Sequence, residues 1–311
     1  MFFFSLTTCW DSSQDSERQI AIPYPIRLFG NRLWYRLLSL TIGILSIDSH
    51  TVSDSLRGAV RPLAISVAPP LITSFVVLFL LAILALFPLL LSAQRWEDLI
   101  IPTPLTSDDT LIIGFHGGRD RWDNQRVGVG RMALRLKLLQ ASRLYVQTFE
   151  NRKRELALRF VQEALDRDYD GVLSGDEAAS ARIVLYGESF GGAAVIKFAR
   201  QLRQFHVPVL LTVQIDSVGL GDEVVPTNVR CAANLYQRNG RFVRGPENIR
   251  AADPSRTHIL GNWRFDYRNS AIDISDLPWY KTILRKDHSR MDRDPLVWQR
   301  VEELIINAIT P

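Results

Sequence analysis

Residues 182–192 read RIVLYGESFGG, and this stretch decides the fold class of the chain. Its first half is a short run of branched and aromatic residues, which predicts a buried β-strand. Gly187 and Gly191 flank Ser189, and a helical pattern starts directly afterwards at Phe190. A strand that turns sharply into a helix lifts the serine hydroxyl above the edge of the sheet, where it can act as a nucleophile. The helix N-terminus and the Phe190 amide would then face a developing oxyanion.

The sequence around this stretch alternates apolar strand-like runs with amphipathic helical patterns. Strands are predicted at 110–115, 144–148, 182–186, 208–215 and 229–236. Helices are predicted at 131–140, 152–165, 190–205 and 294–309, the last of which begins with an Asp cap followed by proline. This alternation predicts an α/β fold with a doubly wound, mostly parallel sheet covered by helices on both faces. Residues 96–311 suffice for one such domain.

The composition excludes several classes of protein. The 311 residues include 37 Lys and Arg and 33 Asp and Glu, and the basic residues are dispersed, so we expect no nucleic-acid partner. Only 18 Gly and 15 Pro exclude collagen-like and low-complexity chains. The two cysteines, Cys9 and Cys231, lie too far apart in the sequence to form a disulfide framework or a cysteine zinc site.

Residues 71–91 contain no charged side chain and predict a transmembrane helix, because a helix of this length spans about 30 Å. Arg57 and Arg61 precede the segment and Arg95 alone follows it closely, which favours a single-pass topology with residues 96–311 outside the cytoplasm. Cleavage after the segment, and a second crossing near 37–47 that would reverse the orientation, stay open. Residues 1–70 receive no assignment.

A glycine-rich loop follows the first predicted strand of the domain. Residues 115–118 read FHGG, and only glycine lets a backbone approach a substrate carbonyl closely. The amides of His116, Gly117 and Gly118 are therefore predicted to complete an oxyanion hole. The His116 side chain is predicted to position this loop and not to act as a base.

An activated serine needs a general base, and His288 is the predicted one. His50 precedes the transmembrane segment, His206 precedes a strand at the end of the sheet opposite to Ser189, and His258 begins a predicted strand. His288 lies in a predicted loop before the last helix, which fits a chain order of serine, acid, histidine.

The acid that orients this base is predicted to be Asp216. It follows the strand after the Ser189 helix, at the carboxyl edge of the sheet where ligands collect. Asp222, Asp273 and Asp276 remain rivals from less certain positions.

With these residues in view, the chain resembles the α/β-hydrolase family over most of residues 105–311. The short separation of Ser189 and Asp216 is similar to that of thioesterase-type and some lipase-type members. The resemblance implies Ser189 as nucleophile, His288 as general base, Asp216 as its orienting acid, and amides of Phe190 and the His116 loop as oxyanion donors. The chain departs from the family's pattern in two places. The connection 217–228 is short and leaves no room for a large lid, and the last strand around 258–267 is poorly defined.

A second motif lies between a predicted helix and the Ser189 strand. Residues 166–177 read DRDYDGVLSGDE, which fits the calcium loop of an EF-hand that it resembles. The predicted calcium ligands are Asp166, Asp168, Asp170, the Val172 carbonyl, Ser174 and Glu177. No partner hand is present, so we expect a structural ion and not a sensor.

These features together predict a membrane-anchored serine hydrolase that cleaves a small-molecule or lipid-like ester or thioester through an acyl-enzyme, with structural Ca²⁺ and no organic cofactor. Two alternatives stay open. The domain could be a catalytically silent, calcium-dependent binding or scaffold module, or it could transfer the acyl group to an acceptor other than water. The sequence predicts neither the substrate nor the oligomeric state.

Overall fold

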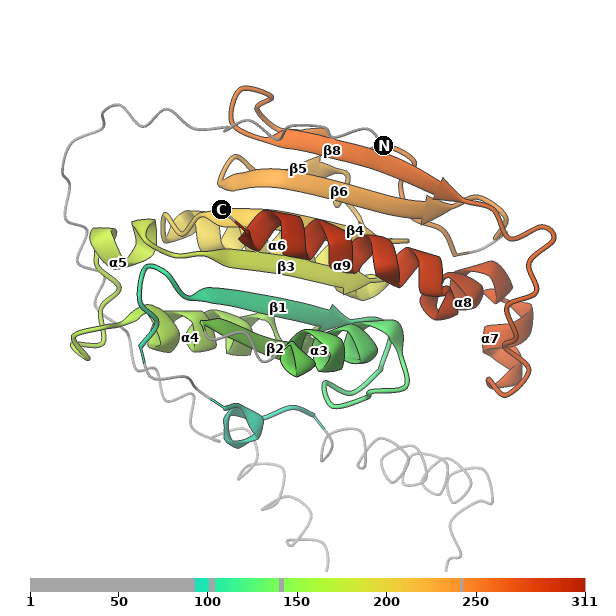
Figure 1. Ribbon diagram of the computed structural model, residues 1–311, viewed down its shortest axis with the longest axis horizontal. Helices are drawn as coiled ribbons and strands as arrows, with labels where there is room; N and C mark the ends of the chain where they lie inside the picture. Colours follow the sequence, from blue (N-terminus) through green and yellow to red (C-terminus); the bar gives the residue numbers. More distant parts are fainter. Residues whose placement is uncertain (1–92, 101–103, 140–142, 241–242, 311) are drawn as a thin grey trace, which may run out of the picture. The chain divides into compact units, whose positions relative to one another are not determined.

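The computed structural model describes residues 93–100, 104–139, 143–240 and 243–310. These residues build a six-stranded sheet in which every neighbouring pair of strands is parallel. The strand order is β2 (Leu144–Glu150), β1 (Thr110–His116), β3 (Ile183–Glu188), β4 (Val209–Ile215), β6 (Val229–Gln237) and β8 (His258–Phe265) (Figure 1). The predicted parallel sheet is therefore confirmed.

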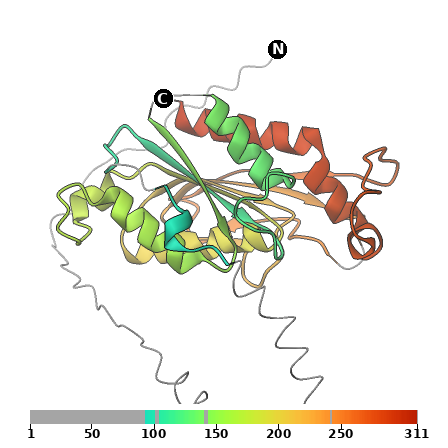
Figure 2. The same ribbon diagram turned by 90° about the horizontal axis from the view of Figure 1, so that it is seen from below.

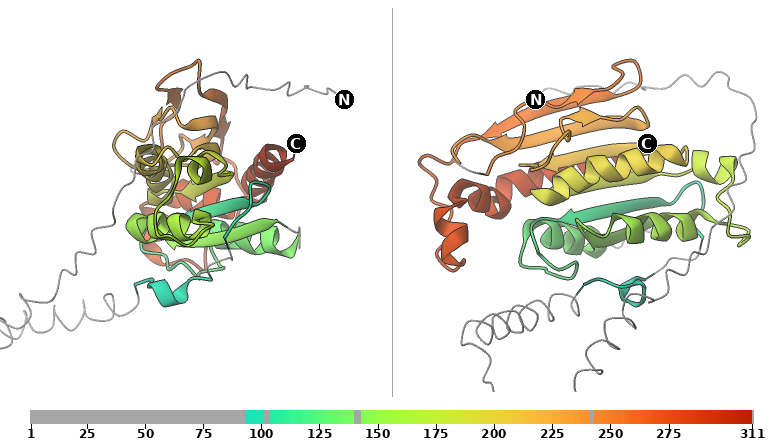
Figure 3. Two further views of the ribbon diagram at one scale, coloured as in Figure 1. Left: turned by 90° about the vertical axis from the view of Figure 1, so that its left-hand side faces the viewer. Right: turned by 180° about the vertical axis from the view of Figure 1, so that it is seen from behind.

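Helices cover both faces of this sheet, as predicted. Helices α3 (Gly128–Leu138) and α9 (Pro295–Ile309) lie on one face, and α4 (Arg154–Leu165) and α6 (Phe190–Gln204) lie on the other (Figures 2 and 3). The Asp294 side chain caps α9 by accepting a hydrogen bond from Leu296 N at 2.9 Å.

Two apolar cores result from the alternation of side chains along the strands. In β3, Ile183 and Leu185 belong to the core beneath α4 and α6, whereas Val184 and Tyr186 belong to the core beneath α3 and α9. All four side chains are fully buried. A strand buried on both faces explains why residues 182–186 read as a continuous apolar run.

The remaining elements are short. They are η1 (Trp96–Asp98), α5 (Gly175–Ala179), α7 (Trp279–Ile283), α8 (Lys286–Arg293) and a parallel pair of two-residue strands, β5 (Val224–Val225) and β7 (Arg250–Ala251). Helices α7 and α8 lie beyond the carboxyl ends of the strands (Figure 1). One sequence interpretation needs correction. His288 lies in α8 and not in a loop. The poorly defined last strand is β8, a half-exposed edge strand whose pairing with β6 shifts register between Ala232 and Ala233.

The predicted transmembrane helix 71–91 and the unassigned segment 1–70 lie outside the described residues. Within the described part of the chain, no helix combines the length and the apolar character needed to cross a bilayer.

The parallel sheet brings three predicted site segments to one edge. Because the carboxyl ends of parallel strands lie at the same edge, the residues that end or follow β1, β3 and β4 become neighbours. These residues are His116, Ser189 and Asp216. Helix α8, which carries His288, lies at this same edge (Figure 1).

Candidate active site

Ser189 occupies a strained turn between β3 and α6. Its φ of 59° and ψ of −126° fall in a region that residues other than glycine rarely adopt. The turn is held because the Ser189 amide donates to the Ile215 carbonyl at 3.0 Å. A Cβ atom on Gly191 would lie 2.0 Å from the Phe115 carbonyl oxygen, so only glycine fits at this position of the motif. The structure therefore contains the strained turn that the motif predicted, held against the ends of β4 and β1.

The loop after β1 lies directly against this turn. A Cβ atom on Gly117 would lie 3.0 Å from the Ser189 Cβ atom. The Asn151 amide donates to the carbonyls of His116 at 3.0 Å and Gly118 at 2.7 Å, which fixes the path of the loop. Since a trans peptide directs its N–H opposite to its C=O, the Gly117 amide points away from Asn151.

Three predicted oxyanion donors are free of other acceptors. Within residues 93–310 as described, no hydrogen bond engages the amides of Gly117, Gly118 or Phe190. Phe190 is the first residue of α6, where amides have no intrahelical acceptor. These donors lie beside the serine and are available to a ligand oxygen.

The His116 side chain contributes no charge to this loop. Its ring is fully buried, and burial, which outweighs the attraction of Asp120, lowers the pKa of His116 to about 4. The imidazole is therefore neutral at pH 7.

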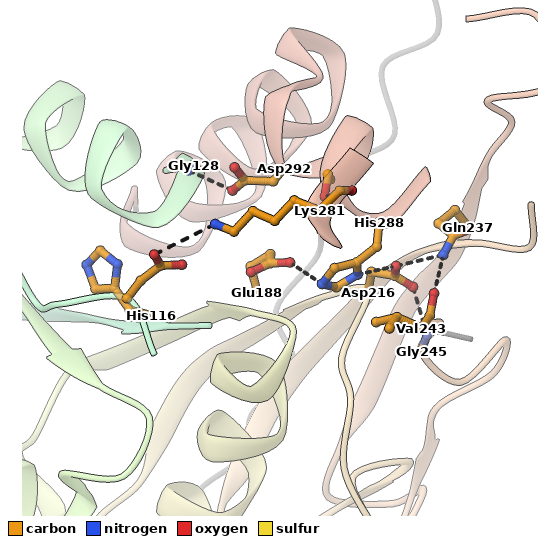
Figure 4. A network of polar contacts seen from close by, with 12 residues as sticks. His116, Gly128, Glu188, Asp216, Gln237, Val243, Gly245, Lys281, His288 and Asp292 are labelled. Carbon is orange, nitrogen blue, oxygen red and sulfur yellow. Dashed lines mark hydrogen bonds and ion pairs between the residues drawn. The ribbon is translucent and has the colours of Figure 1, made fainter. Parts of the chain in front are cut away.

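Asp216 follows β4 and is completely buried. Its Oδ2 atom lies 2.7 Å from His288 Nδ1 and also accepts from the Gln237 amide at 2.9 Å. Its Oδ1 atom accepts from the Gly245 amide at 2.7 Å. Three nitrogen atoms, from His288, Gln237 and Gly245, thus engage one carboxylate, which fixes the orientation of the histidine ring (Figure 4).

The rival acids have other partners. Asp222 interacts with the Ser217 hydroxyl, Asp276 with the Arg293 guanidinium, and Asp273 with the Ser275 amide. None of the three is paired with His288 within the part of the chain that the structure describes.

His288 has a second carboxylate partner, which sequence reasoning missed. Its Nε2 atom lies 2.8 Å from Oε1 of Glu188, the last residue of β3 and the residue before Ser189 (Figure 4). Carboxylates only accept hydrogen bonds when ionised, so a ring held between two of them carries both protons. Burial alone would lower the pKa of His288, but Glu188 and Asp216 outweigh it and raise this pKa to about 10.

The contact with Glu188 decides the state of the site. No hydrogen bond joins the Ser189 hydroxyl to His288 among the described residues, because Nε2 is directed at Glu188 instead. Ser189 and His288 nevertheless lie at the same sheet edge, since Glu188 is adjacent to one and in contact with the other. A signal for Glu188 is present in the sequence: it is an ionisable residue at the end of an otherwise apolar buried strand.

A hollow of about 1160 Å³ opens beside these groups. It is lined by the loop after β1 (residues 117–120, the oxyanion loop), the start of α6 and the α7 region. The lining residues are Gly118, Arg119, Asp120, Asn151, Arg152, Phe190, Val243, Tyr280, Lys281, Leu284 and Arg285.

The predicted calcium loop forms a separate cluster. Ligand atoms of Asp166, Asp168 and Glu177 lie within 4.8 Å of one another. Gly171 has a φ of 77°, and its amide donates to Asp166 Oδ2 at 2.9 Å, so the glycine makes the sharp turn expected of it. The other oxygen, Asp166 Oδ1, is buried without a hydrogen-bond partner in the described residues, and burial raises the pKa of Asp166.

The remaining predicted ligands have partners of their own. Glu177 accepts hydrogen bonds from the Arg167 amide and from the Ser174 amide and hydroxyl. Asp170 accepts from the Val172 amide at 2.7 Å. The structure therefore gathers three of the six predicted ligands, whereas Ser174 caps α5.

Comparisons with known proteins give only remote likenesses. No protein-family model and no curated protein matches this sequence. A cutinase-like protein from Cryptococcus sp. is similar in structure, with a TM-score of 0.33 and 14% identity over 65% of this chain and 95% of its own. A structure of RedJ with a polyethylene glycol molecule in its active site has a TM-score of 0.28 and 11% identity, over 54% of this chain and 85% of its own. At these scores neither likeness bears on the activity.

Proposed function

We propose that the protein is a serine hydrolase that cleaves an ester or thioester through an acyl-enzyme on Ser189. One observation carries the proposal: the buried Asp216–His288 pair lies at the edge of the sheet where the strained turn presents Ser189. Strain of this kind persists only where the surrounding structure enforces it, and it collects at reactive sites.

The reaction proceeds in two halves. The Ser189 oxygen attacks the substrate carbonyl carbon while its proton passes to His288 Nε2, and the imidazolium then gives this proton to the departing alcohol or thiol. A water molecule attacks the acyl-enzyme in the same way, and Ser189 regains a proton as the acid departs. Asp216 holds the Nδ1 proton throughout. Amides of Phe190, Gly117 and Gly118 stabilise the oxyanion, where one donor contributes about 10²- to 10³-fold in rate.

Glu188 sets a condition on this mechanism. His288 Nε2 must release its proton and turn from Glu188 to the Ser189 hydroxyl before it can act as a base. The active form is therefore the minor protonation state at neutral pH, and activity rises with pH.

A fluorophosphonate probe tests the proposal directly. The wild-type chain should be labelled at Ser189, and Ser189→Ala should not be labelled while its thermal midpoint stays nearly unchanged. His288→Ala should lose labelling, whereas His258→Ala, which alters an exposed histidine at the start of β8, should keep it. Labelling that survives in Ser189→Ala would exclude this nucleophile.

A second candidate function is a catalytically silent binding module. The observation that favours it is the engagement of His288 Nε2 by Glu188 in place of Ser189. Absence of labelling at every pH up to 10, together with calcium-dependent binding of a partner, would favour this reading over hydrolysis. Product analysis with added alcohols distinguishes hydrolysis from acyl transfer.

We also propose that Ca²⁺ binds the cluster of Asp166, Asp168 and Glu177 as a structural ion. The support is the convergence of these carboxylates and the buried, unmatched Asp166 Oδ1 atom, which a cation would neutralise. Such an ion would brace the connection from α4 into β3, which ends beside Ser189.

Membrane anchoring through residues 71–91, with the hydrolase domain on the extracytoplasmic side, remains a proposal from the sequence. Alkaline carbonate extraction of membranes tests it: the full chain should stay in the pellet, and a double substitution Leu80→Arg and Leu84→Arg should release it. Full release of the wild-type chain would contradict the anchor.

A further inference from the structure

The hollow beside Ser189 has more cationic than anionic side chains in its lining. Four of its lining side chains are cationic and only one, Asp120, is anionic. Two of the cations are compensated, since Lys281 lies 4.0 Å from Asp120 and Arg152 lies 3.0 Å from Glu150. The other two, Arg119 and Arg285, have no carboxylate within 4.0 Å among the described residues.

Arg285 is the more informative of these two. It is half-buried, and its Nε atom is buried without a hydrogen-bond partner in the described part of the chain. One terminal nitrogen lies 4.0 Å from the position of a Cβ atom on Gly118, so the guanidinium is next to the oxyanion loop. Its guanidinium carbon lies 5.7 Å from the centroid of the Tyr280 ring. A half-buried guanidinium without a counter-ion, at the mouth of a reactive site, is suited to bind an anionic group of a ligand.

Glu188 is anionic, but it does not neutralise the positive charges of Arg119 and Arg285. It is buried at the base of the site and paired with the imidazolium of His288, so its charge is already compensated. The lining also includes the apolar side chains of Phe190, Val243 and Leu284. The lining therefore matches a ligand that has both an apolar body and a negative charge.

We infer that the natural substrate is an ester or thioester with an apolar body and a carboxylate or phosphate group, whose anion binds Arg285 and Arg119. This inference rests on the proposed hydrolase function, and it specifies the class of substrate for the same site. The reaction at the carbonyl is unchanged, and the anion serves only to hold the substrate in the hollow.

A kinetic comparison tests the selectivity. The ratio of kcat/KM for p-nitrophenyl hemisuccinate to kcat/KM for p-nitrophenyl butyrate should exceed one in the wild type. In Arg285→Gln this ratio should fall about 10- to 100-fold, as expected for loss of a charge-assisted hydrogen bond. The matched control is Arg203→Gln, which removes an exposed arginine from the last turn of α6, at the end of that helix opposite to Phe190. The control should leave the ratio unchanged.

A binding measurement keeps the test independent of catalysis and separates the two anions. Calorimetry on full-length Ser189→Ala should show binding of ethyl hydrogen succinate or of monobutyl phosphate that weakens at least tenfold in Ser189→Ala/Arg285→Gln. Neutral diethyl succinate should bind equally to both proteins. The stronger of the two anions identifies the group.

The outcomes separate the two proposals. Suppose that the neutral ester is hydrolysed. A ratio of the two kcat/KM values at or below one, or equal anion binding to Ser189→Ala and Ser189→Ala/Arg285→Gln, then overturns the anionic substrate class and leaves the hydrolase function standing. Absence of hydrolysis and of probe labelling, with anion binding that still depends on Arg285, overturns the hydrolase and supports the anion site.

Discussion

Replacing Glu188 by glutamine should shift the pH dependence of ester hydrolysis to lower pH. Glutamine keeps the size of the side chain, but it removes one of the two charges that hold His288 as an imidazolium. With a pKa of about 10 in the wild type, roughly one imidazole in 1000 is neutral at pH 7. Each unit by which the pKa falls in Glu188→Gln increases the neutral fraction about tenfold, with a ceiling of about 1000-fold.

The assay is kcat/KM for p-nitrophenyl butyrate between pH 5 and 10, with the spontaneous rate subtracted at each pH. The acid limb of the pH profile, along which kcat/KM rises with pH, should move to lower pH in Glu188→Gln, and kcat/KM at pH 7 should rise. Glu303→Gln, which alters an exposed carboxylate on α9, should leave the profile unchanged. An acid limb at the same pH in wild type and Glu188→Gln, or a loss of activity at every pH, would refute the reasoning. The NMR titration of the His288 ring reports the same pKa without turnover.

Three further predictions concern the charged groups of the fold. Asp216→Asn should lower kcat about 10⁴-fold in steady-state assays, because the amide presents a donor to Nδ1 and forces the tautomer whose Nε2 cannot accept a proton; an unchanged kcat would contradict this role. The raised pKa of His288 stabilises the folded state fully below about pH 6.5, and this contribution is lost as the pH rises to about 10. Urea unfolding should therefore show a steeper fall of the unfolding free energy from pH 7 to 9.5 in wild type than in His288→Gln, by up to about 1.4 kcal/mol per pH unit, and parallel curves would disprove the linkage. Calcium at tenfold its Kd should stabilise the wild type by about 1.4 kcal/mol, which corresponds to a rise of roughly 4 °C in Tm. A chelator should reverse this rise, and Asp166→Asn should abolish it. No shift of Tm at saturating calcium would exclude the site.

Sequence reasoning was most effective where a feature depends on neighbours along the chain. The turn at Ser189 follows from a buried strand, small flanking residues and an immediate helix, all within residues 182–192. The strands β1, β2, β3, β4 and β6 were predicted within about two residues of their ends, because period and side-chain branching are local properties. The last strand, β8, was predicted but only poorly defined, because it is a half-exposed edge strand, and α8 was predicted as a loop, because its residues are mostly polar.

The site itself was only partly accessible. Asp216 and His288 lie 72 positions apart. Asp216 was predicted from the rule that parallel strands end at one edge, and His288 from the chain order serine, acid, histidine and the unsuitable positions of the other histidines. The role of Glu188 was not predicted, because the motif leaves the residue before the serine unspecified. Its charge matters only through the position of α8, which no local pattern fixes.

The sequence by itself determined the order of strands and helices along the chain, the strained turn at Ser189 and the spacing of acidic residues in 166–177. Only the tertiary structure decided which charge faces which: Glu188 against His288, and Arg285 without a counter-ion beside the oxyanion loop. The physical reason is that hydrophobic periodicity and turn geometry act between residues near in the chain, whereas electrostatic partners are set by distance and burial in space.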